Sequence, residues 1–80
     1  MTTITYKINF DAVGSVLNLR HEIVSITQIA NRGRCKVYTD GTDNLVIDPH
    51  GFVTHEDNNR DGAVSCIIND WYNKGYIELI

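Results

Sequence analysis

The chain has 80 residues, of which 42% are hydrophobic, and its formal net charge is −3. This length allows one domain, 1–80, and the composition excludes a disordered chain. No stretch approaches the roughly 18 apolar residues that span a membrane. The first ten residues lack the apolar run of a signal peptide, so we expect a cytoplasmic protein.

Charge is distributed unevenly along the chain. Residues 1–39 carry five Lys and Arg against two Asp and Glu, whereas residues 40–80 carry two against eight. Charge distribution governs partners and association rates rather than fold. The pattern therefore indicates a binding surface.

Apolar and polar side chains alternate over residues 3–10, which predicts a strand with one buried face. The segment 11–31 that follows supports two structures. Its apolar residues have helical spacing with Asp11 as N-cap, but residues 23–29 are rich in β-branched side chains that favour a strand. We predict a strand at 22–30 after a short helix or loop. A helix over 12–31 would instead give the ferredoxin-like order βαββαβ.

Turn sequences divide the middle of the chain into a β-meander over 22–55. Residues 31–33 fit a three-residue hairpin loop, and Asp40-Gly41 is typical of a two-residue type I′ hairpin. Residues 48–51, Asp-Pro-His-Gly, fit a type I turn with glycine at its fourth position. Strands are expected between these turns, at 35–39, 45–47 and 52–55.

The C-terminal quarter predicts an amphipathic helix at about 62–74 and a final strand at 76–80. Gly75 is placed to end the helix in a Schellman motif. One face of the helix carries Val64, Ile67, Ile68, Trp71 and Tyr72. The predicted fold class is α+β, with a small, mainly antiparallel sheet and a C-terminal helix.

Two sequence patterns bear on metal binding. Residues 57–62 match the first half of an EF-hand loop, but Ile68 stands where the bidentate acid is needed, and capping of the helix by Asn59 or Asp61 explains the loop without calcium. A second group clusters around one turn and the next strand but lacks the fixed four-ligand pattern of a zinc site. Its members are Asp48, His50, His55 and Asp57. We therefore predict no metal and no cofactor.

Catalytic patterns are weaker still. Ser65 or Cys66 could be paired with His50 or His55 as base, but no nucleophile elbow or oxyanion loop surrounds them. The glycines are scattered singly and form no phosphate cradle. We predict no catalytic residue and a protein that is not an enzyme.

A basic group lies in the first half of the chain. Arg32, Arg34 and Lys36 alternate beside Tyr38, and in one strand they would form a cationic strip ending in an aromatic ring. Such a strip can hold phosphates and stack a base. Binding of RNA or single-stranded DNA is the alternative function, although a pI of about 5.4 is low for it.

Acidic residues dominate the predicted turns and loops of the second half. Loop tips on a rigid sheet often bind partners, and carboxylates there can pair with the cations of a basic protein. We expect a non-enzymatic protein-binding module that occludes a basic, nucleic-acid-binding surface of its partner, with homodimerisation as a further expectation. The acidic candidates are Asp40, Asp43, Asp48, Glu56, Asp57 and Asp61.

In size, acidity and lack of catalytic residues, the chain resembles the small inhibitors of phages and mobile elements. That broad class includes anti-CRISPR and immunity proteins. The resemblance implies an anti-defence or immunity role, exerted by mimicry of a nucleic acid or by direct blocking of a protein surface.

Overall fold

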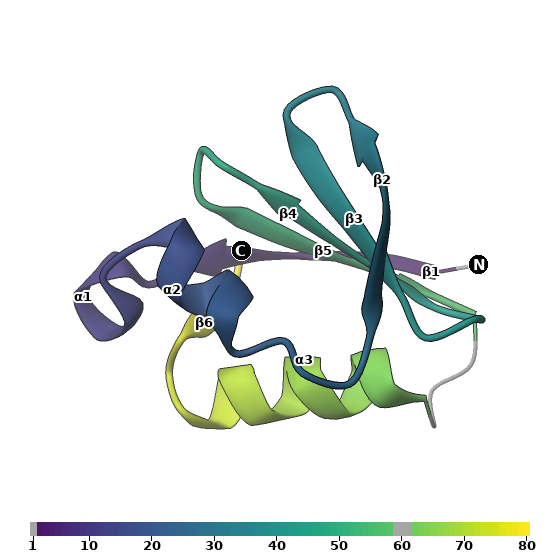
Figure 1. Cartoon of the computed structure of the whole chain (residues 1–80). Coiled ribbons are helices and arrows are strands. Elements are labelled where there is room, and N and C mark those ends of the chain that lie inside the picture. Colours follow the sequence, from purple (N-terminus) through teal and green to yellow (C-terminus); the bar gives the residue numbers. More distant parts are fainter. Residues whose placement is uncertain (1, 59–61) are drawn as a thin grey trace.

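The computed structural model describes residues 2–58 and 62–80, and within them six strands form one antiparallel sheet accompanied by three helices (Figure 1). The strand order is β2-β3-β4-β5-β1-β6. The helices are α1 (Phe10–Val13), α2 (Val16–His21) and α3 (Ala63–Asn73). The strands are β1 (Thr2–Ile8), β2 (Thr27–Arg32), β3 (Cys35–Thr39), β4 (Asn44–Asp48), β5 (Phe52–Asp57) and β6 (Ile77–Leu79). The predicted α+β class and C-terminal helix are confirmed.

The sheet has two different faces. One face is covered by α3, which runs beneath the sheet, and by the α1–α2 segment at the end where β1 stops (Figure 1). The core forms between these layers and contains Leu19, Leu45, Val53, Ile68 and Trp71. Among the described residues, no helix is both long enough and apolar enough to cross a membrane.

The first strand is confirmed, but it is shorter than predicted. Ile4, Tyr6 and Ile8 point toward the core, whereas Phe10 starts α1 and stays partly exposed. The chain leaves the sheet at Asn9, whose side chain accepts a hydrogen bond from the backbone N–H of Asp11 and so caps α1. The predicted strand therefore extends two residues too far, and the prediction that Phe10 lies on its buried face is wrong.

Of the two structures considered for residues 11–31, the strand preceded by helix is the one that forms. Two short helices come first, and Ser15 caps the second by accepting a hydrogen bond from the N–H of Asn18 at 3.0 Å. The strand begins only at Thr27 and pairs antiparallel with β3. The ferredoxin-like order does not arise, because the segment after α2 joins the sheet edge.

Two of the predicted turns differ in length from the structure. Arg32 pairs directly with Cys35, so the first hairpin has a two-residue connection that begins at Gly33. Thr39 pairs with Asn44, so the second hairpin has a four-residue loop, 40–43, in place of a type I′ turn. The turn at 48–51 is confirmed, since the N–H of Gly51 donates to the carbonyl oxygen of Asp48 at 3.0 Å.

The end of α3 follows the predicted Schellman motif. The N–H of Tyr76 donates to the carbonyl of Trp71, and that of Gly75 donates to Tyr72. Gly75 has a φ of +77°, a left-handed conformation that glycine adopts without strain. The chain is thereby turned back, so that β6 pairs with β1 beside the helix.

Candidate functional site

Asp40, one of the acidic candidates, ties a loop to a helix. Its Oδ1 accepts hydrogen bonds from the N–H groups of Thr42 and Asp43, and its Oδ2 accepts one from the N–H of Val64. Gly62 is the N-cap residue of α3 and has no side chain to cap the helix, so Asp40 supplies the cap from the β3–β4 loop. A Cβ on Gly62 would collide with this carboxylate, which explains the glycine. The capping proposed for Asn59 or Asp61 falls outside the described residues, as does Asp61 as a binding residue.

Burial raises the pKa of Asp40, but hydrogen bonds from the Val64, Thr42 and Asp43 N–H groups and from the Thr42 hydroxyl outweigh it and lower the pKa from 3.8 to about 2. Because the folded-state pKa lies below the unfolded value, the ionised group stabilises the fold above pH 3.8 and this contribution is lost as the pH falls toward 2.

Asp40→Asn should therefore lower the free energy of unfolding by about 1 kcal/mol at pH 7 and flatten the fall in stability between pH 4 and pH 2. Urea unfolding at a series of pH values measures both effects. Gly62→Ala, which pushes the same carboxylate aside, should reproduce the flattening. An unchanged pH dependence in both variants would contradict the capping role.

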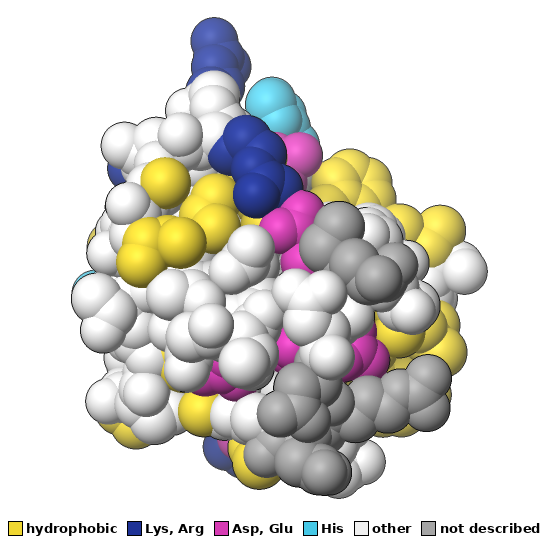
Figure 2. All heavy atoms as spheres, turned by 90° about the vertical axis from the view of Figure 1, so that its right-hand side faces the viewer, with side chains coloured by type: hydrophobic (Ala, Val, Ile, Leu, Met, Phe, Trp, Pro, Cys, Tyr) yellow, Lys and Arg dark blue, Asp and Glu magenta, His cyan; other side chains and the backbone are white. Residues whose placement is uncertain are grey.

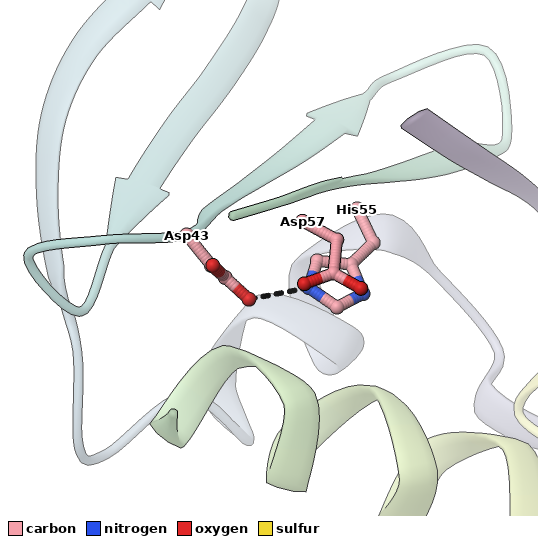
Figure 3. Close-up of side chains that lie close together, drawn as sticks. All are labelled: Asp43, His55 and Asp57. Carbon is pink, nitrogen blue, oxygen red and sulfur yellow. Dashed lines mark hydrogen bonds and ion pairs between the residues drawn. The ribbon is translucent and has the colours of Figure 1, made fainter. Parts of the chain in front are cut away.

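Asp43 is fully buried, with 0% of its surface exposed, and it contacts His55, which is 5% exposed. Asp43 Oδ2 lies 2.9 Å from His55 Nε2, and its Oδ1 accepts the N–H of Asn58 at 2.7 Å. Asp57 follows His55 by two residues on β5, so both side chains leave the same face of the sheet. Figure 3 shows Asp43, His55 and Asp57 converging on the space between the sheet and α3.

The space beside this cluster is a hollow of about 340 Å³ between the sheet and α3. His55 and Asp57 line it from the sheet, and Ser65 lines it from the first turn of the helix. The sequence-based pairing of Ser65 with His55 thus brings together residues that do border one hollow. Cys66 is exposed, and His50 lies in the β4–β5 turn at the other end of β5.

Glu56 of β5 is hydrogen-bonded by residues of β2 and β4 on the sheet face opposite α3. Both Arg32 Nη atoms donate to its carboxylate, at 2.6 and 3.2 Å, and Asn44 adds a third hydrogen bond. The hydrogen bonds from Arg32 and then from Asn44 lower the pKa of Glu56, and the same pairing raises the pKa of Arg32. This acidic candidate is half-buried and neutralised within the molecule.

The expected cationic strip is divided between two faces of the hairpin. Lys36 and Tyr38 lie on the same face of β3, and the Tyr38 hydroxyl, buried in the core, accepts a hydrogen bond from Arg20. Arg32 lies opposite Cys35, on the other face, and Arg34 lies in the turn between the strands. Figure 2 likewise shows basic and acidic side chains interspersed, outside the grey residues, rather than gathered by sign.

A different surface brings polar, charged and aromatic groups together. Asp48 pairs with Phe52, Phe52 with Lys7, and Lys7 with Glu78, so these four side chains form one row across β4, β5, β1 and β6. Phe10, which packs near Gly51, stands at the end of this row. Lys7, Phe52, Glu78 and Phe10 border a hollow of about 570 Å³, the aromatic hollow, which is lined by residues 7–11, 50–52 and Glu78.

The rim of the aromatic hollow includes a bonded pair. Asp48 Oδ1 accepts the backbone N–H of His50 at 2.8 Å and lies 3.0 Å from its ring Nδ1. The backbone hydrogen bond from His50 lowers the pKa of Asp48, with the ring contact adding to it. Asp48 is thus the sequence-predicted acidic candidate that lies beside this surface.

No sequence pattern marks the two phenylalanines as binding residues. The alternation over residues 3–10 predicts Phe10 on the buried face of a strand, and Phe52 carries no signal beyond the start of one. Fold class does not settle function either, because small α+β folds host many activities. The chain matches no protein-family model, no curated protein and no solved structure.

Proposed function

We propose that the protein is a non-enzymatic protein-binding module and that the aromatic hollow receives its partner. The observation that carries this proposal is the exposure of two phenylalanine rings at one hollow: Phe10 is 43% and Phe52 39% exposed. Exposed aromatic side chains with neighbouring polar groups are typical of the energetically dominant residues of interfaces.

The charges at the hollow favour a basic partner. Asp11 and Glu78 contribute carboxylates to its lining, and Lys7 contributes an ammonium group. Asp48 lies next to the hollow, where it accepts a hydrogen bond from the lining residue His50. A partner segment that combines an apolar side chain with a neighbouring Lys or Arg would fill the hollow and pair with its carboxylates. Such a segment is expected on nucleic-acid-binding proteins, so we propose inhibition by occlusion, of the anti-defence or immunity-protein type.

A library of displayed random 12-residue peptides tests this proposal without knowledge of the partner. Selected peptides should share an aromatic or large aliphatic residue next to Lys or Arg. Phe52→Ser and Phe10→Ser should each weaken their binding by about 10-fold or more, since interface aromatics commonly contribute over 1.4 kcal/mol.

Leu17→Ser is the matched control, because Leu17 is also an exposed apolar side chain, 54% accessible, but lies outside the hollow. The Leu17→Ser variant should bind the selected peptides with the affinity of the wild type. If both phenylalanine variants fold and bind the selected peptides unchanged, the hollow is not the interface.

Binding of RNA or single-stranded DNA is the alternative proposal, and the division of Arg32, Arg34 and Lys36 between two faces and a turn weakens it. A labelled single-stranded oligonucleotide, titrated at several salt concentrations, separates the two. Tight, salt-dependent binding that Arg34→Ala and Lys36→Ala reduce would support it over the protein-binding function.

A further inference from the structure

The cluster between the sheet and α3 combines three side chains that commonly bind metals. Asp43 comes from the β3–β4 loop, while His55 and Asp57 come from β5 (Figure 3). Each offers one ligand atom, and these three atoms lie within 4.8 Å of one another. The proximity depends on the fold, because Asp43 is separated from the other two by the whole of β4.

Two of the donors are close to the separation that ligands of a divalent ion have. Asp43 Oδ2 and His55 Nε2 are 2.9 Å apart. Two ligands of a tetrahedral Zn²⁺ ion, each about 2.1 Å from the metal, lie about 3.4 Å apart. A Zn²⁺ ion could replace the proton between these two atoms if they move apart by about 0.5 Å and the imidazole turns to direct Nε2 at the metal, the ring proton then residing on Nδ1.

A separate observation at the same hollow concerns Ser65. Its side chain is more than nine-tenths buried, and its Oγ has no hydrogen-bond partner among the described residues. Buried hydroxyls nearly always have a partner, so this one calls for a partner such as a water molecule or an ion. Ser65 lines the same hollow as His55 and Asp57, from the α3 side.

We propose that Asp43, His55 and Asp57 bind one divalent transition-metal ion, for which Zn²⁺ is the best candidate, and that Ser65 completes or orders its coordination from α3. Imidazole with carboxylates suits Zn²⁺ and its first-row neighbours, whereas Ca²⁺ and Mg²⁺ prefer oxygen donors alone. The hollow leaves space for water ligands and a route of entry.

The surroundings of Asp43 support its role as a ligand. The N–H of Asn58 donates to Oδ1, which fixes the carboxylate and leaves Oδ2 directed at His55. Hydrogen bonds of this kind orient ligands in metal sites. The group expected around one turn, Asp48, His50, His55 and Asp57, does not form one site, because Asp48 and His50 lie at the other end of β5.

Zinc binding to the full chain, purified in EDTA and then desalted, tests the proposal. Isothermal titration with ZnCl₂ should give one ion per chain, and saturating Zn²⁺ should raise Tm by about 5 °C or more. Co²⁺ should bind in competition with Zn²⁺ and give visible absorption bands that report its ligands. Absence of bound Zn²⁺ in the wild type would overturn the proposal.

Two variants locate the ion. Asp57→Asn removes one ligand charge with little change in shape and should weaken Zn²⁺ binding at least 10-fold. His50→Gln is the matched control, because His50 belongs to the other aspartate–histidine pair, on the surface. Zinc affinity retained in Asp57→Asn but lost in His50→Gln would overturn the assignment. If Asp57→Asn does not fold, the Co²⁺ spectrum of His50→Gln decides: loss of the wild-type bands excludes the buried site.

Discussion

Replacing Asp43 by Ala is expected to lower the free energy of unfolding by about 3–5 kcal/mol, because two hydrogen-bonding groups lose their partner at about 1–3 kcal/mol each. The substitution leaves the buried ring of His55 and the N–H of Asn58 without the carboxylate that they contact. A chain of 80 residues has a total stability of only about 4–12 kcal/mol, so much of it would be lost.

Asp48→Ala provides the matched control for this prediction. Asp48 also contacts a histidine ring, at 3.0 Å, but both partners are on the surface. Its loss should reduce stability by less than about 1 kcal/mol. Urea unfolding followed by the fluorescence of Trp71, the single tryptophan, compares the two variants directly. Equal destabilisation would show that the buried pair contributes no more than a surface pair.

Replacing Trp71 by Ala is expected to be similarly damaging, at about 3–5 kcal/mol, because it opens a large cavity in the core. Trp71 is the largest of the fully buried side chains and lies in the core cluster between the sheet and α3. Its carbonyl also accepts the Schellman hydrogen bond from Tyr76, so loosening here affects the return of the chain into β6.

Tyr72→Ala, at the next position of the same helix, is the control for Trp71→Ala. Tyr72 is partly exposed, and its ring makes an edge contact with Tyr6 at 6.3 Å. Its removal should cost about 1 kcal/mol. Thermal unfolding followed by far-UV circular dichroism suits both variants, since neither needs the tryptophan signal. A Trp71→Ala protein as stable as Tyr72→Ala would contradict the central role of this side chain.

The elements predicted best from the sequence are those set by local chemistry. The stripe from Val64 to Trp71 and the glycine at position 75 define α3 and its end, because helix periodicity and left-handed glycine act within a few residues. The turn at 48–51 is local in the same way. The segment 11–31 was harder, because its apolar spacing and its β-branched residues favour different structures.

The candidate site was least predictable, because it depends on contacts between distant segments. From the sequence alone, the acidic residues lie on predicted turns and loops, and this position favours a surface that is open to a partner. In the structure, Asp40 reaches across to cap α3, Asp43 enters the core to meet His55, and Glu56 pairs with Arg32. No local sequence pattern distinguishes a carboxylate that forms hydrogen bonds or ion pairs within the chain from one that is available to another molecule.

The sequence by itself determined the α+β class, the meander, the C-terminal helix and the uneven charge, since each follows from spacing and composition along the chain. Only the tertiary structure decided which side chains lie close together in space. It divided Arg32 from Lys36 by the pairing register of one hairpin, and it joined Phe10 to Phe52 at the aromatic hollow. Register and strand order are set by the packing of the whole core, and so they cannot be derived from any one segment.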